Sequence, residues 1–118
     1  MPTDGGVGKT EVFMGRFYTA RIVEDAPATT LKIGFGAESA QNDLIVPDAI
    51  AAIKELGLTG GTIVRLDGPA SLPVAIAIAH ELSHLYGAVA ALDPKIGKYV
   101  VAVAHGGEYV VGQLLNLD

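Results

Sequence analysis

The segment from Leu72 to Tyr86 reads LPVAIAIAHELSHLY, and it constrains the fold more than any other part of the chain. Ser71 is suited to cap its start, a proline lies in its first turn, and Gly87 follows it, so the segment is predicted to be a helix. Apolar side chains surround its first two turns almost completely. A helix of this kind must be covered on more than one side, and we expect the partners to be a sheet and a second subunit.

The rest of the chain is predicted to supply a sheet and one more helix. Residues 10–24 predict one long strand, or a strand bent at Gly15, and residues 31–35 predict a second strand antiparallel to it. Pro47 marks the expected start of the other helix, which Gly57 ends. Further strands are predicted at residues 62–67, 88–92, 98–104 and 108–115. Two helices on a mixed sheet of about five to six strands predict a two-layer α/β sandwich, ferredoxin-like, in one domain of residues 10–118.

Residues 1–9 are predicted to be a flexible leader. Residues 5–10 read GGVGKT, which resembles a phosphate-binding loop. That motif requires a glycine where this chain has Thr3, and it requires a buried strand before the loop, which so few residues cannot supply. The phosphate-loop interpretation is therefore set aside in favour of the leader.

Composition and charge exclude several classes of function. The net charge of −5 argues against a sequence-independent grip on duplex DNA or RNA. The chain has no cysteine, which excludes disulfides, thiolate metal sites and a cysteine nucleophile. Its longest apolar run, Leu72 to Ala79, has eight residues, far fewer than the roughly 20 that a membrane-spanning helix needs. No apolar signal segment opens the sequence, so a cytoplasmic protein without membrane attachment is expected.

The predicted helix carries two histidines four residues apart, so both side chains lie on one face. As letters, His80-Glu81-Leu82-Ser83-His84 is the zinc-protease motif, with two imidazole ligands and a glutamate as general base. A third ligand is also needed, and Ala90 stands where the metzincin pattern has a histidine. His105, Asp93 and Glu108 are the candidates that remain. The alternative is that the histidines are structural, since positive charge suits the end of a helix.

Two turns add groups that suit a phosphate or another oxyanion. The turn from Gly68 to Ser71 joins a strand to a helix start, where free backbone amides favour an anion, although an ordinary capped turn explains it equally well. Asp93-Pro94-Lys95 follows a strand and His105 follows the next one, and we expect both strand ends near one edge of the sheet. There they could polarise a phosphodiester, although Asp-Pro is also typical of a type I turn.

The distance along the helix limits what a single chain can do with these groups. From Ser71 to His84 the helix rises by about 20 Å, so one small ligand cannot touch both ends. If both ends handle the same ligand, they come from different subunits.

The order of motifs resembles a known family. GPASLP, a helix with paired histidines, AVAALDPKIGKYVVAVAH and EYVVGQLL are similar to the CRISPR-associated ring nucleases of the Csx-three type, also called Crn-three. The resemblance covers roughly residues 60–115. It implies a type III CRISPR accessory enzyme that degrades cyclic tetra-adenylate, the second messenger of an antiviral defence. It also implies a homodimer that stacks into a tetramer or filament on the ligand, and a manganese-dependent RNA exonuclease activity.

The resemblance also implies roles for individual residues. His84, Asp93, Lys95 and His105 correspond to catalytic positions, and Gly68 and Pro69, with Ser71 just beyond, correspond to the ligand-binding turn. His80 is a further ligand-binding candidate of this sequence. A manganese ion would be held by His80, His84 and Asp93. Lys95 stands where the family has arginine, so the positive charge is kept but the planar, two-pronged grip on phosphate is not. The alternatives are a small zinc-dependent hydrolase and a non-catalytic cyclic-nucleotide-binding module.

Overall fold

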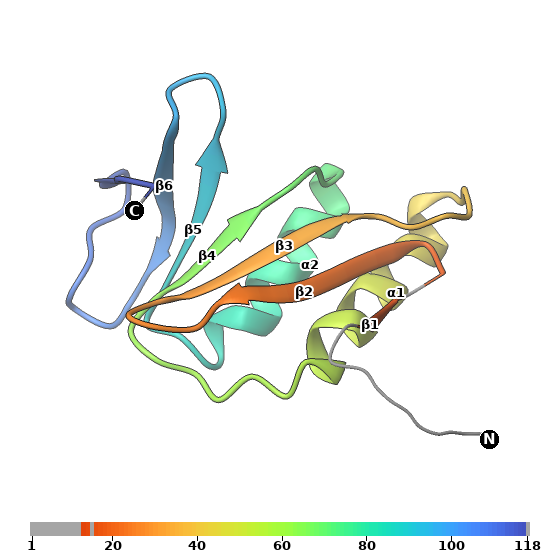
Figure 1. The fold of residues 1–118 in the computed structure, drawn as a ribbon, viewed down its shortest axis with the longest axis horizontal. Coiled ribbons are helices and arrows are strands. Elements are labelled where there is room, and N and C mark those ends of the chain that lie inside the picture. The colour runs from red at the N-terminus through yellow and green to blue at the C-terminus, as the bar shows by residue number, and fades with distance from the viewer. Residues whose placement is uncertain (1–12, 15, 118) are drawn as a thin grey trace.

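The computed structural model describes residues 13–14 and 16–117, and these form one mixed sheet with both helices on one of its faces (Figure 1). The predicted two-layer, ferredoxin-like α/β sandwich is therefore confirmed. Five longer strands are flanked by the two-residue strands β1 and β7. The strands are β1 (Phe13–Met14), β2 (Tyr18–Glu24), β3 (Thr29–Phe35), β4 (Val64–Asp67), β5 (Ala88–Asp93), β6 (Lys98–Ala104) and β7 (Leu114–Leu115).

The strands lie in the sheet in the order of the sequence, from β1 to β7. β3, β4 and β5 are parallel, and the other neighbours are antiparallel. Helix α1 (Asn42–Glu55) connects β3 to β4, and α2 (Leu72–Ser83) connects β4 to β5. Because both right-handed crossovers step in the same direction along the sheet, both helices cover the same face.

Helix α1 begins five residues before Pro47, so the prediction that Pro47 starts this helix is wrong. The first turn closes because the amides of Leu44 and Ile45 both donate to the carbonyl of Gln41, at 3.0 Å. Pro47 then removes a single donor, the one that would reach the carbonyl of Asp43, and the remaining turns hold the helix together.

Helix α2 begins as predicted, since the amide of Val74 donates to the hydroxyl of Ser71 at 3.3 Å. It ends at Ser83, three residues before the predicted Tyr86, because Tyr86 forms an isolated parallel bridge with Gly61. Neither α1 nor α2 combines the length and the hydropathy that a bilayer-crossing helix requires, and no other helix occurs in the described ranges.

Two apolar clusters lie on the two faces of the sheet. The larger cluster packs the helices against the sheet, with Val74, Ile78 and Leu82 of α2 buried against Leu31 and Val64. The smaller cluster includes Ala90, Tyr99 and Val101, with Tyr109 and Leu115 packed against it. The last part of the chain therefore covers part of the face that the helices leave open.

Two other predictions about strands differ from the structure. In place of one strand over residues 10–24, β1 and β2 pair antiparallel as a hairpin. Residues 108–115 contribute only Leu114–Leu115 to the sheet, because the preceding residues turn so that the amide of Gly112 donates to the carbonyl of Val101 at 2.8 Å. The predicted leader, residues 1–9, and the GGVGKT segment lie outside the described residues.

Candidate functional site

The turns after β4 and β5 lie at one edge of the sheet, because parallel strands end at the same edge. We call this the turn edge, and it consists of Gly68–Ser71 and Asp93–Lys95. A cavity of about 570 Å³ opens there, lined by Lys32, Asp67, Gly68, Pro69, Ala70, Leu92 and Pro94. Ligands of open α/β sheets commonly bind outside the carboxyl ends of parallel strands. The structure thus brings Gly68 and Pro69 together with the Asp93 turn, as a common ligand site requires.

The Gly68–Pro69 turn is fixed by the fold itself. Gly68 has a φ of 143°, and a Cβ atom there would overlap the carbonyl oxygen of Ile33. The buried hydroxyl of Tyr18 donates a hydrogen bond to the carbonyl of Pro69 at 2.6 Å. Burial raises the pKa of Tyr18 to about 12. The hydrogen bond from Tyr18 therefore fixes the backbone of this turn. The overlap with the carbonyl of Ile33 explains why residue 68 is a glycine.

The hydroxyl of Ser71 both accepts and donates a hydrogen bond within the protein. It accepts the amide of Val74 and donates to the side-chain oxygen of Asn42 at 2.8 Å. Asn42 is the first residue of α1, so this bond ties the starts of the two helices together at the turn edge. Ser71 thus satisfies the amide of Val74, one of the amides that the helix itself leaves without a partner.

The Asp93 turn is closed by its own side chain and backbone. The carboxylate of Asp93 accepts the amide of Lys95 at 2.9 Å, and its carbonyl accepts the amide of Gly97 at 2.8 Å. The side chain of Lys95 is exposed. Nearby, Lys32 and Asp67 form an ion pair at 3.3 Å. Lys95 thus supplies the exposed positive charge of the Asp93 turn, whereas the nearby Lys32 is paired with Asp67.

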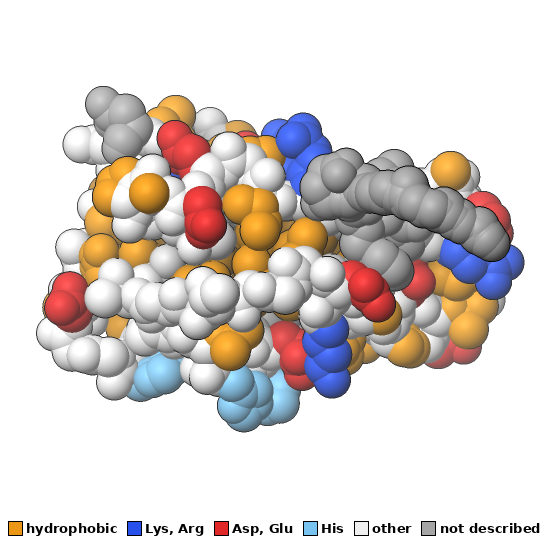
Figure 2. Space-filling view, turned by 60° about the horizontal axis from the view of Figure 1, so that its bottom comes forward, with side chains coloured by type: hydrophobic (Ala, Val, Ile, Leu, Met, Phe, Trp, Pro, Cys, Tyr) orange, Lys and Arg blue, Asp and Glu red, His pale blue; other side chains and the backbone are white. Residues whose placement is uncertain are grey.

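The three histidines gather at the other end of α2, and we call this group the histidine edge. The rings of His80 and His84 lie edge to face with centroids 4.7 Å apart. The Nε2 atom of His105 lies 3.0 Å from the carbonyl oxygen of Ser83, which joins the end of β6 to the end of α2. Figure 2 shows the histidine side chains, in pale blue, along one border of the molecule. All three imidazole side chains are exposed.

The prediction that Asp93, Lys95 and His105 share one edge of the sheet is wrong within a single chain. β5 and β6 are antiparallel, with Asp93 opposite Lys98 and Ala88 opposite Ala104. Asp93 therefore ends β5 at the turn edge, whereas His105 follows β6 at the histidine edge. His80 and His84 lie toward the end of α2 that is remote from Ser71, so within one chain they do not join Gly68, Pro69 and Ser71 or Asp93.

The predicted metal ligands are separated in the same way. Asp93 lies at the turn edge, and His80 and His84 lie at the opposite end of α2. Over residues 13–14 and 16–117 the structure contains no group of three His, Asp or Glu side chains that could hold a metal ion. Ala90, at the metzincin position, is buried in the cluster on the sheet face opposite the helices. His80, His84 and Asp93 therefore do not share one metal ion within a single chain.

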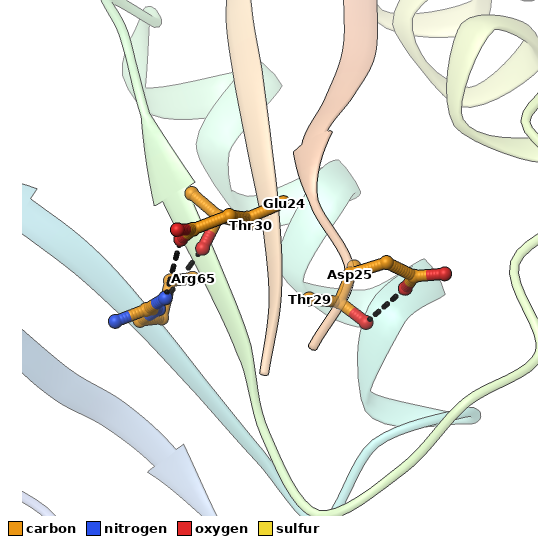
Figure 3. Close-up of polar contacts among 5 residues, drawn as sticks. All are labelled: Glu24, Asp25, Thr29, Thr30 and Arg65. Atoms are coloured by element: carbon orange, nitrogen blue, oxygen red, sulfur yellow. Dashed lines mark hydrogen bonds and ion pairs between the residues drawn. The ribbon is translucent and has the colours of Figure 1, made fainter. Parts of the chain in front are cut away.

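Sequence reasoning missed a polar cluster around Arg65 on the face of the sheet opposite the helices (Figure 3). Arg65 is only 8% exposed. Its Nε atom donates to the hydroxyl of Thr30 and its Nη2 atom to the carboxylate of Glu24, both at 3.0 Å. Its guanidinium also lies over the ring of Tyr99, 5.2 Å from the centroid. In the sequence, this cluster could have been predicted from the single arginine within the largely apolar segment TIVRLD.

The environment of Tyr99 follows from this cluster. Burial raises the pKa of Tyr99, and the charges of Asp67 and Glu24 raise it further, while Arg65 opposes them. The cluster joins β2, β3, β4 and β6 across the face of the sheet opposite the helices.

Comparisons with known proteins leave the family of this chain open. No protein-family model matches it, and neither a curated protein nor a solved structure does. The candidate site therefore rests on the geometry of its two edges.

Proposed function

We propose that this protein is a ring nuclease that binds and cleaves cyclic tetra-adenylate in the cytoplasm, and so switches off signalling in a type III CRISPR defence. One observation carries the proposal: groups suited to a phosphate lie at one end of α2, and groups suited to proton transfer lie at the other. The resemblance of residues 60–115 to ring nucleases supports the choice of substrate. Two copies of the chain, acting together on one ring, supply both sets of groups.

At the turn edge, the amides after Gly68 and the ammonium of Lys95 hold a phosphodiester. There the 2′-hydroxyl oxygen attacks the adjacent phosphorus, the bond to the 5′ oxygen breaks, and a 2′,3′-cyclic phosphate forms. A histidine of the second copy accepts the proton of the 2′-hydroxyl, and another returns a proton to the 5′ oxygen. Lys95 stabilises the charge that develops on the phosphate oxygens.

The first test is incubation with labelled cyclic tetra-adenylate, with and without manganese, followed by chromatography of the products. We expect linear products from the wild type and none from His84→Ala or Lys95→Ala. Lys54→Ala changes an exposed lysine at the end of α1 and should cleave normally. A wild type that leaves the ring intact under both conditions refutes catalysis, and binding without cleavage points to a nucleotide-sensing module.

Mixing the two inactive variants tests whether a site is shared between copies. In a two-site dimer, random exchange makes about half of the dimers mixed, and each of these regains one of its two sites. The mixture of His84→Ala and Lys95→Ala should therefore recover about one quarter of the wild-type activity. A mixture that stays inactive, although its subunits exchange, would show that both residues act within one copy.

The adjacent rings of His80 and His84 favour a second candidate, a small zinc-dependent hydrolase with Glu81 as general base. Such an enzyme should purify with about one tightly bound zinc per chain. Metal analysis of the purified protein therefore separates the two candidates before any substrate is tried.

A further inference from the structure

The cavity at the turn edge contains a pair of opposite charges to which the proposed reaction gives no role. Lys32 and Asp67 are register partners on the parallel strands β3 and β4, and both line the cavity. The partners two residues earlier are Thr30 and Arg65, which lie on the face of the sheet opposite the helices (Figure 3). Because side chains alternate along a strand, Lys32 and Asp67 project from that same face. The cavity therefore lies where this face meets the turn edge.

Both members of the pair keep hydrogen-bonding capacity for a ligand. The Nζ atom of Lys32 and the carboxylate of Asp67 are 3.3 Å apart, and their side chains are 48% and 31% exposed. This distance exceeds the roughly 2.7–2.9 Å of a strong charge-assisted hydrogen bond. An ammonium has about three N–H donors and a carboxylate about four lone-pair sites, and their mutual contact uses one of each. A donor and an acceptor therefore stand side by side at the cavity.

The rest of the lining is mainly apolar. Pro69, Ala70, Leu92 and Pro94 contribute side chains to a cavity of about 570 Å³, and the carbonyl of Pro69 is fixed by the hydroxyl of Tyr18. Sites for small molecules commonly have this size, and they combine apolar walls with a few placed polar groups. The apolar walls suit the flat faces of a nucleobase, and the charged pair suits its polar edge.

The order of donor and acceptor selects among the bases. Along its N6–N7 edge, adenine has an amino donor beside a ring-nitrogen acceptor, whereas guanine has two acceptors, N7 and O6. Pyrimidines have no N7 on the corresponding edge. Asp67 can accept a hydrogen bond from N6 while Lys32 donates one to N7. Guanine on this edge would bring O6 against the carboxylate of Asp67, and the two acceptors would repel one another.

We propose that the turn-edge cavity takes an adenine base, with Asp67 accepting from its N6 amino group and Lys32 donating to its N7. Gly68 lines the same cavity, so the phosphate of that nucleotide lies at the turn where the phosphodiester is held. The choice of adenine as the base rests on the proposed function. The donor beside an acceptor, and the apolar walls around them, do not.

Calorimetric titration with linear tetranucleotides tests the proposal without requiring a ring or its cleavage. The wild type should bind tetra-adenylate at least about tenfold more tightly than tetra-inosinate, in which an O6 acceptor replaces the N6 amine. It should also prefer tetra-adenylate to the 7-deaza analogue, in which carbon replaces N7. Equal affinities for tetra-adenylate and tetra-inosinate, or no binding of tetra-adenylate, overturn the proposal.

Two variants assign these preferences to single side chains. Asp67→Asn should lose most of the preference over tetra-inosinate, because its amide can donate to O6. Lys32→Met should bind tetra-adenylate and the 7-deaza analogue equally. Both variants should keep the stability of the wild type, since an exposed ion pair contributes little to it. A preference for tetra-adenylate over tetra-inosinate that survives in Asp67→Asn places base recognition elsewhere and overturns the proposal.

Arg21→Met is the matched control. Arg21 is exposed and lies opposite Lys32 on β2, but it is not part of the described lining of the cavity. Its loss removes the same charge as Lys32→Met from a neighbouring position, so both base preferences should be unchanged. If Arg21→Met erases the preferences as fully as Lys32→Met does, net charge and not the hydrogen bond explains them, and the proposal fails.

Base recognition and cleavage can fail separately. A protein that shows both base preferences but leaves cyclic tetra-adenylate intact keeps the adenine site and loses the nuclease. A protein that cleaves the ring but binds tetra-adenylate and tetra-inosinate equally keeps the nuclease and loses the adenine site.

Discussion

The hydroxyl of Tyr18 should stabilise both the fold and the turn edge, and Tyr18→Phe tests this. The ring is fully buried, and its edge-to-face contact with Phe35 is retained in the variant. Only the 2.6 Å hydrogen bond to the carbonyl of Pro69 is removed. Losing the bond and leaving the carbonyl without this partner should lower the free energy of unfolding by about 2 kcal/mol at neutral pH.

This difference between wild type and variant should depend on pH. Burial raises the pKa of Tyr18 from 10.0 to about 12 in the folded protein. The unfolded chain therefore loses this proton first, and the contribution is complete below pH 10 and is lost as the pH rises through about 12. By linkage, about 2 kcal/mol is lost by about pH 11.5, so the wild type and Tyr18→Phe should there be about equally stable.

Urea unfolding of both proteins from neutral to high pH measures the difference. Titration of tyrosinate absorbance in the folded proteins should also show that an ionisation near pH 12 disappears in the variant. A stability difference that stays constant across this range, or a Tyr18 that ionises near pH 10 in the folded wild type, would contradict the buried, hydrogen-bonded hydroxyl.

Urea unfolding also checks three further predictions. Asp48→Ala should cost about 3 kcal/mol, because this carboxylate accepts the amides of Phe17 and Tyr18, at the start of β2, at 2.8 and 2.9 Å. The exposed Asp43→Ala should cost less than about 1 kcal/mol. Arg65→Met should cost about 1–2 kcal/mol by removing two hydrogen bonds, and tyrosinate titration should show a higher pKa for Tyr99, which the arginine lowers. Gly68→Ala should cost about 3 kcal/mol or more because of its backbone conformation. Gly34→Ala, whose new Cβ would meet only Pro69 at 3.9 Å, should cost less than about 1 kcal/mol. An Asp43→Ala variant as unstable as Asp48→Ala, or a Gly34→Ala variant as unstable as Gly68→Ala, would contradict the contacts described.

The parts of the fold that could be predicted from sequence are those specified by local signals. Ser71 as cap and a proline in the first turn of the apolar segment predict the start of α2, and the structure confirms it. The end of α2 could not be predicted in the same way, because Tyr86 is drawn into a bridge with Gly61, 25 residues earlier in the chain. The start of α1 was misplaced because Pro47 is a common first residue of helices, yet a proline near the start also fits inside one.

The polar contacts that hold the site were harder to predict than its turns. Asp48 directly follows Pro47 in α1, and its carboxylate reaches the start of β2, about 30 residues away in sequence. Tyr18 and Pro69 are 51 residues apart, and Arg65 and Glu24 are 41 apart. Such contacts depend on the register between strands, and the pattern of apolar residues in one strand does not contain that register.

The separation of Asp93 from His105, however, could have been deduced from the sequence. Asp93-Pro94-Lys95-Ile96-Gly97 is a tight turn between two strands, and a tight turn makes its strands antiparallel. The strand that leaves this turn must carry His105 away from Asp93, to the edge where α2 ends. One chain therefore cannot bring the aspartate and lysine of this turn to its own histidines without breaking the β5–β6 hairpin. If these groups act on one phosphodiester, the histidines must belong to another copy.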